Sequence, residues 1–317
     1  MGFVEGGKDS IPQLFEKALG RPLEQRVSLG DFSNFRIGGE ADFFFAPRSP
    51  HELQTCLQMA RGHGLPFYVI GDGTNILFDD EGFRGLIVKS EVRGIKEDKE
   101  GRVEAFSGTS LSELVEFALN EGWEGLEFAA GIPGTVGGAV FGNAGAFGRS
   151  IGEFLEEAIL LDGNGRKRRV QNAYFEFGYR HSSLKKSHWT LLRAAFRLSK
   201  GDRGRIRAQI EENLEKRKSR HPSIQTAYAG SYFKNPVLPD GTKASAGFLL
   251  EKVGAKELRV GGAAVYPGHA NFLINLGQAK AADVLELARQ LKERVKAEFG
   301  VELEEEVIYL PADFSMP

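Results

Sequence analysis

The chain has 317 residues, a formal net charge of −2, 41% hydrophobic residues and 26% charged residues. This length allows more than one domain, and the near-neutral charge excludes a general basic surface that would recruit nucleic acid or an anionic membrane. The single cysteine, Cys56, excludes an internal disulfide and a cysteine-based metal site. Because neither a signal-type N-terminus nor an apolar run of about 18 residues occurs, we expect a cytoplasmic protein.

The first half of the chain alternates predicted strands and helices. The motif Ser49-Pro50-His51-Glu52 predicts a helix start with an N-cap serine and a proline at the first helical position. A second capping pair, Ser110 and Glu113, predicts another helix, which Gly122 ends. Strands are predicted at residues 42–46, 67–70, 86–88, 103–106, 158–161 and 191–198.

The second half begins with a charged helix at residues 203–218, which we interpret as the connection between two halves. Strand-like segments follow at 231–233, 259–265 and 271–276. An amphipathic helix with apolar residues at helical spacing then ends at Gly300. Alternation predicts a last strand over Val301–Leu310. The sequence therefore predicts an α+β protein with two halves.

Many of the 40 glycines cluster in two loops. The loop Gly71-Asp72-Gly73-Thr74-Asn75-Ile76 follows a strand and begins like a dinucleotide fingerprint, but Ile76 stands where the third glycine belongs. The second loop, residues 131–148, interleaves seven glycines with apolar residues. This pattern is typical of a buried loop whose backbone N–H groups point at an anion such as a pyrophosphate. A glycine-rich packing corner is the alternative, and the spacing alone leaves both open.

A set of motifs occurs in order along residues 33–308. They are Phe35-Arg36-Ile37-Gly38-Gly39, residues 70–77, residues 131–138, Tyr179-Arg180-His181-Ser182-Ser183, residues 230–236, Ala246-Gly247-Phe248-Leu249-Leu250-Glu251, His269-Ala270-Asn271-Phe272 and Leu303-Glu304-Glu305-Glu306-Val307. Each motif alone is modest evidence, whereas the ordered set is specific. It resembles the family of UDP-N-acetylenolpyruvoylglucosamine reductases.

The resemblance implies a two-part FAD-binding domain of the PCMH or vanillyl-alcohol-oxidase type over residues 1–202, divided near 90–100. A smaller α+β substrate-binding domain over 203–317 follows. It also implies NADPH as reductant and the shorter of the family's two sub-types, because the passage after Tyr179 is short. Neither glycine loop contains His or Cys, so we expect FAD to be bound non-covalently. The implied FAD contacts are Gly71, Asp72, Gly73, Thr74, Asn75, Ile76, Gly131, Ile132, Pro133, Gly134, Val136, Gly137, Gly138, Asn143, Ala144 and Gly145.

The implied reaction reduces UDP-N-acetylglucosamine enolpyruvate to UDP-N-acetylmuramate for peptidoglycan synthesis. The resemblance assigns hydride transfer to flavin N5, proton donation to Ser231, and stabilisation of the enolate to Arg180 and Glu306. From the residues alone, Ser231 is an ordinary turn serine and Arg180 a surface arginine. Alternation likewise places Glu306 on a solvated strand face. The family usually has an arginine two positions after this acid, where this chain has Ile308.

The resemblance also implies substrate contacts and a monomer. The substrate contacts are Arg220, Asn235, Lys256, His269 and Asn271. The remaining histidines have no paired spacing, and we predict no metal site.

Two other functions fit a flavin-binding fold. One is an oxidase of the same superfamily that acts on an alcohol or a sugar. The other is a nucleotide- or flavin-binding module without catalysis. The absence of a covalent-linkage residue and the presence of the Ser231 and Glu306 motifs argue against the oxidase. The intact set of Arg180, Ser231 and Glu306 argues against the module, because a non-catalytic protein has no chemical need for all three.

Overall fold

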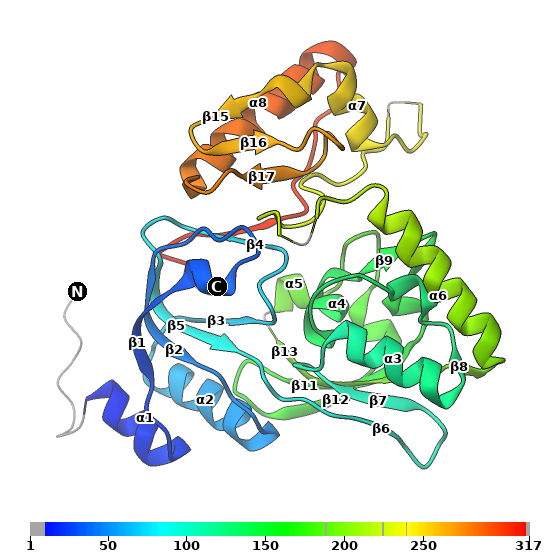
Figure 1. Ribbon diagram of the computed structural model, residues 1–317. Coiled ribbons are helices and arrows are strands. Elements are labelled where there is room, and N and C mark those ends of the chain that lie inside the picture. Colours follow the sequence, from blue (N-terminus) through cyan, green and yellow to red (C-terminus); the bar gives the residue numbers. More distant parts are fainter. Residues whose placement is uncertain (1–9, 188, 224, 239, 315–317) are drawn as a thin grey trace.

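The computed structural model describes residues 10–187, 189–223, 225–238 and 240–314, whose elements form three groups in space (Figure 1). The N-terminal group contains a four-stranded sheet in the order β1-β2-β5-β3, in which only β1 is antiparallel to its neighbour. Helix α2 packs against α1 and against this sheet through a core that contains Cys56. The elements are α1 (Ile11–Leu19), β1 (Glu24–Ser28), β2 (Glu40–Phe45), α2 (Pro50–Gly62), β3 (Phe67–Ile70), β4 (Ile76–Phe78) and β5 (Phe83–Lys89).

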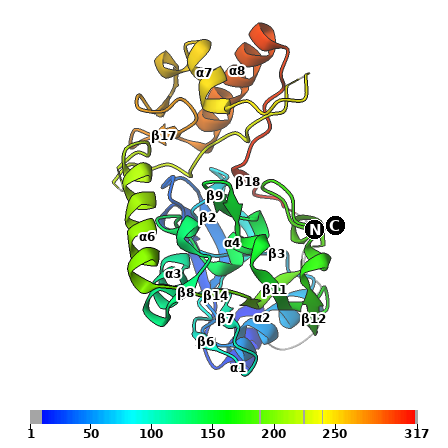
Figure 2. The same ribbon diagram turned by 90° about the vertical axis from the view of Figure 1, so that its right-hand side faces the viewer.

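The central group is built on a five-stranded antiparallel sheet in the order β12-β11-β13-β7-β6. Helices α3 and α4 cover one face through a large apolar core, and α6 runs alongside α3 and β8 (Figure 2). The elements are β6 (Ile95–Glu97), β7 (Val103–Phe106), α3 (Leu111–Glu121), β8 (Trp123–Glu124), α4 (Val136–Gly142), β9 (Gly145–Ala146), β10 (Arg149–Ser150), β11 (Leu155–Leu161), β12 (Lys167–Gln171), α5 (Leu184–Ser187), β13 (Thr190–Phe196), β14 (Ser199–Lys200) and α6 (Arg203–Lys218).

The C-terminal group lies above the other two in Figure 1 and packs α7 and α8 on a three-stranded antiparallel sheet. The chain then returns to the N-terminal group, where Ile308 lies opposite Ile76 in a parallel pair. Within the described ranges, no helix combines the length and apolar character needed to cross a bilayer. The elements are α7 (Ala246–Lys252), β15 (Arg259–Val260), β16 (Ala263–Val265), β17 (Leu273–Asn275), α8 (Ala281–Phe299) and β18 (Ile308–Leu310).

The predicted helix ends are confirmed. Ser49 and Ser110 accept hydrogen bonds from the N–H groups of the residues three positions later. Gly122 and Gly300 end α3 and α8 in the left-handed conformation. The domain division at residue 203 stays a prediction, although α6 packs against α3 and Asn213 donates to Glu127 of the central group.

Three secondary-structure expectations are wrong. The second glycine loop contains a helix, α4, whose N-cap is Thr135. Within 301–310 only β18 is a strand, because Val301 and Leu303 pack in the C-terminal core without pairing with a strand. The segment 231–233 is likewise limited to an isolated bridge between Phe233 and Glu305.

One interaction joins the N-terminal and C-terminal groups across 201 residues of sequence. The Asp80 carboxylate accepts hydrogen bonds from Ala281 N at 2.7 Å and Ala282 N at 3.1 Å, the first two residues of α8. We expect Asp80→Ala to lower the free energy of unfolding by about 1 kcal/mol, because two helix N–H groups lose their acceptor. Urea unfolding measures the loss. The exposed neighbour variant Glu81→Ala is the control, and equal losses in both would contradict the capping role.

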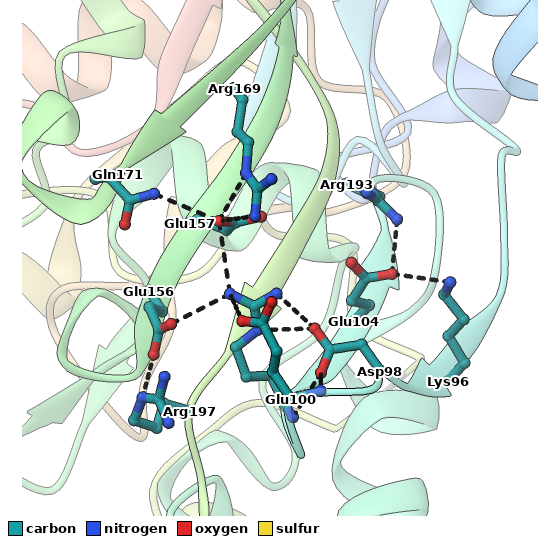
Figure 3. A network of polar contacts seen from close by, with 11 residues as sticks. Lys96, Asp98, Glu100, Glu104, Glu156, Glu157, Arg169, Gln171, Arg193 and Arg197 are labelled. Atoms are coloured by element: carbon teal, nitrogen blue, oxygen red, sulfur yellow. Dashed lines mark hydrogen bonds and ion pairs between the residues drawn. The ribbon is translucent and has the colours of Figure 1, made fainter.

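The strands of the central sheet and their flanking residues carry a network of charges around Arg102, and Figure 3 labels its partners Asp98, Glu156 and Glu157. Only 6% of its side chain is exposed, and its guanidinium lies 2.6 Å from Asp98, 3.2 Å from Glu156 and 3.5 Å from Glu157. We expect Arg102→Met to lower the free energy of unfolding by about 1–3 kcal/mol, because the substitution leaves several carboxylates without their shared cation. This is less than the loss expected for a deeply buried ion pair, since some partners are open to water, among them Glu100, whose side chain is 62% exposed.

Urea unfolding at low and high salt tests this expectation. The matched control is Arg169→Met, which removes an exposed arginine from the same network. Salt should reduce the difference between wild type and Arg102→Met. A loss no larger than that of the control would show that the network contributes little.

Candidate active site

A large cleft lies where the three groups meet, and residues from all three line it. Its volume is about 1880 Å³. Single small-molecule sites typically have roughly 300–1,000 Å³, so this cleft has room for a dinucleotide and a second ligand. Both glycine loops lie on its wall.

The first glycine loop presents a row of backbone donors. None of the N–H groups of residues 71–75 donates to another group in the described part of the chain. Gly73 has a φ of +64°, and a Cβ atom there would overlap with the Phe32 carbonyl. A Cβ on Gly71 would overlap with the Thr135 hydroxyl of the second loop. Glycine therefore lets the two loops touch while the amides stay available, which is the arrangement of an anion-binding nest.

The second loop corrects part of the sequence-based expectation. The N–H groups of Val136 and Gly137 donate to Thr109 and Ser107 carbonyls, both at 2.8 Å, and that of Gly138 donates to the Thr135 hydroxyl. These three amides cap and anchor α4, so their hydrogen bonds are made within the protein. Much of the loop still borders the cleft, and at Gly134 a Cβ would come within 2.9 Å of Thr74 Oγ1.

Fourteen of the sixteen expected FAD contacts line the cleft, and Val136 and Asn143 do not. Val136 is the first residue of α4 and is fully buried. The Asn143 side chain is used internally, since it donates to the Gly178 carbonyl at 2.8 Å and accepts from Gly152 N at 3.0 Å. The free amides of the first loop, the close glycine approaches and the volume together fit a bound dinucleotide such as FAD.

The three expected catalytic residues line this same cleft. Arg180 Nε lies 2.6 Å from Glu306 Oε1, but its N–H does not point at the oxygen, so the contact is an ion pair without a hydrogen bond. The backbone N–H of Glu306 donates to the carbonyl of Tyr232, the residue after Ser231, at 2.7 Å. Asn75 of the first glycine loop donates to the Glu306 carbonyl at 3.1 Å. The structure thus joins segments from all three groups at one point.

The Glu306 side chain is only 18% exposed, whereas those of Glu302 and Glu304 are 73% and 72% exposed. The solvated-face interpretation is therefore wrong for Glu306. Burial raises the pKa of the Glu306 carboxyl, and the positive charges of Arg180, Lys185 and Lys234 reduce that rise.

The expected substrate contacts divide into two sets. Arg220, Asn235 and His269 line the cleft, whereas Lys256 and Asn271 do not. Lys256 pairs with Glu251 at 2.6 Å. Asn271 is buried and exchanges two 2.9 Å hydrogen bonds with the Phe233 backbone, so it supports the segment that carries Ser231. Sequence spacing cannot distinguish a residue that contacts the substrate from a nearby residue that supports the backbone of the site.

Several residues that line the cleft are not among the site residues predicted from the sequence. They include Lys185, Arg217, His221 and Tyr228. Arg217 Nε donates to the Gly131 carbonyl at 3.1 Å. Their only sequence signal is proximity to a motif, which does not show where a side chain points. Among the described residues, no group of three or more His, Cys, Asp or Glu side chains could hold a metal ion.

The pKa of His221 predicts an acid-sensitive element. Burial, with smaller effects of Arg217 and His269, lowers this pKa to about 4. Between about pH 6.5 and 4 the unfolded chain therefore binds more protons at this position, and stability falls as the pH falls. After allowance for partial exposure, we expect His221→Asn to reduce the stability difference between pH 7.5 and 4.5 by about 1 kcal/mol. Urea unfolding at both pH values checks this, with the exposed His51→Asn as control, and an unchanged difference contradicts it.

Comparisons with known proteins agree with this site. Residues 221–310 match the family model of the UDP-N-acetylenolpyruvoylglucosamine reductase C-terminal domain, and residues 41–171 match that of an FAD binding domain. The reductase of Moorella thermoacetica is 44% identical over 281 residues, which cover 88% of this chain and 90% of that protein. The reductase of Clostridium tetani is 36% identical and covers 96% of this chain and 98% of that protein.

Among solved structures, the reductase of Thermus caldophilus superposes with a TM-score of 0.77 at 33% identity. The match covers 91% of this chain and 99% of that one. The two-part FAD-binding fold is therefore confirmed. With these identities over nearly the whole length, the chain belongs to the family of UDP-N-acetylenolpyruvoylglucosamine reductases.

Proposed function

We propose that this chain reduces UDP-N-acetylglucosamine enolpyruvate to UDP-N-acetylmuramate in peptidoglycan synthesis, with NADPH as reductant and non-covalent FAD. The observation that carries the proposal is that one cleft joins the free amides of residues 71–75 with the Arg180–Glu306 pair and Ser231. The names of the similar proteins agree with it. A cytoplasmic location and a monomeric state remain predictions.

FAD, when bound along the two glycine loops, would supply a hydride to the terminal carbon of the substrate double bond. The protein must then supply one proton to the carbon beside the carboxylate, so that hydride and proton together saturate the bond. The Ser231 hydroxyl is the proposed donor and regains its proton from solvent. NADPH restores the reduced cofactor and leaves as NADP⁺.

Arg180 is proposed to bind the substrate carboxylate and to offset the charge that develops beside it. Its Nε donates no well-aligned hydrogen bond within the described part of the chain, and the guanidinium is half-buried and faces Glu306. A planar guanidinium can hold a carboxylate by two parallel hydrogen bonds. Arg220, Asn235 and His269, which border the cleft, are proposed to contact the rest of the sugar nucleotide.

Anaerobic flavin absorbance tests the proposal. The purified protein should be yellow, lose colour with NADPH, and regain it with UDP-N-acetylglucosamine enolpyruvate in the absence of oxygen. If only oxygen restores the colour, the FAD assignment stands and the substrate assignment fails. Because one cleft serves both reactants in turn, we expect ping-pong initial-rate kinetics, and a ternary-complex pattern would contradict alternating use.

A further inference from the structure

Lys185 occupies an unusual place in the cleft. It lies on the short helix α5, and its Nζ donates to the backbone carbonyl oxygen of Arg180 at 2.9 Å. Burial lowers the pKa of this amine, and the charge of Lys234 lowers it further. A half-buried lysine gives up both hydration and side-chain freedom, so a position like this calls for a specific contact.

Arg180, whose backbone carbonyl accepts the hydrogen bond from Lys185, has a strained backbone conformation. Arg180 has a φ of +53°, a left-handed value that residues other than glycine rarely adopt. It lies in a tight turn in which Gly178 and His181 exchange backbone hydrogen bonds of 3.1 and 3.2 Å. A strained backbone conformation persists only where surrounding contacts hold it in place, and such conformations occur mainly at functional sites. Asn143 anchors the start of the turn at Gly178, and Lys185 anchors Arg180 itself.

The charge of Lys185 also remains available to the site. Three cations influence Glu306, namely Arg180, Lys185 and Lys234. Lys234 is engaged by Glu304. In the described part of the chain, the Lys185 amine has no carboxylate within ion-pair distance, and its one hydrogen bond is to the Arg180 carbonyl.

We propose that Lys185 is a positioning residue of the reduction, which holds the left-handed turn at Arg180 and thereby keeps the guanidinium against Glu306. This inference rests on the proposed function, because it acts through the residue assigned to the substrate carboxylate. Lys185 need not touch the reacting atoms. Without it, the turn can relax and the guanidinium can leave its place.

The test compares Lys185→Met with Lys186→Met, an exposed neighbour on the same helix. In Lys185→Met, re-oxidation of the reduced flavin by the enolpyruvyl sugar nucleotide should slow by about 10- to 100-fold, since a small misplacement of a binding group has effects of that size. Flavin reduction by NADPH and the melting temperature should stay as in the control. Equal slowing of both half-reactions, or no slowing, would overturn the proposal.

A double-mutant cycle separates action through Arg180 from an independent effect. Adding Lys185→Met to Arg180→Met should slow re-oxidation no further. If the effects of the two substitutions on the re-oxidation rate are fully additive, the proposal is contradicted. A crystal structure of Lys185→Met gives a readout that does not depend on the substrate. Arg180 should leave the left-handed region, and retention of its φ with the guanidinium still against Glu306 would overturn the proposal. A wild-type protein that the sugar nucleotide cannot re-oxidise would instead reject the proposed function.

Discussion

Ser231→Ala should slow re-oxidation of the reduced flavin by the enolpyruvyl sugar nucleotide by about 10²–10⁴-fold, the range for losing a positioned proton donor. The hydroxyl can act because the carbon beside a carboxylate becomes strongly basic as hydride arrives. Reduction of the flavin by NADPH needs no proton from this side chain and should be unchanged. Stopped-flow absorbance of the two half-reactions measures both effects.

The matched control for Ser231 is Ser223→Ala, which removes an exposed hydroxyl from the same stretch of chain. The structure supports the role through placement, since Asn271 and Glu306 form hydrogen bonds with the backbone of Tyr232, the residue after Ser231. If Ser231→Ala re-oxidises at the wild-type rate, the proton comes from another group or from water.

Arg180→Met should lower the same re-oxidation rate by about 10²–10³-fold, because a preorganised group that stabilises developing charge contributes on this scale. Arg180→Lys should recover part of the loss, since it keeps the charge and loses the planar fork. Removal of the guanidinium also takes away the nearest cation of the buried Glu306 carboxyl, so the pKa of Glu306 should rise further.

The control for Arg180 is Arg207→Met on the exposed side of α6. Steady-state kinetics adds a distinction between two ways of losing activity. A loss confined to KM would mean that Arg180 binds substrate and transition state equally, and it would contradict the charge-stabilising role. A parallel loss in kcat and kcat/KM supports that role.

The sequence by itself determined several helix ends and the family. Helix ends at Ser49, Ser110 and Gly122 follow from hydrogen bonds within a few residues, and such contacts are readable from spacing. The amphipathic pattern of α8 predicts its buried face for the same reason. The ordered motifs identify the family, whose membership the identities along the chain confirm.

Only the tertiary structure decided which polar side chains meet. The bond between Asn75 and the Glu306 carbonyl spans 231 residues, and no local period encodes such a contact. Glu306 and Glu304 share one alternating pattern, yet only Glu306 is covered by neighbouring segments. Likewise, the amides at residues 136–138 serve α4 rather than a ligand, and Lys185 reaches the Arg180 carbonyl. Local propensity acts over a few residues, whereas burial and long-range pairing depend on the packing of all three groups.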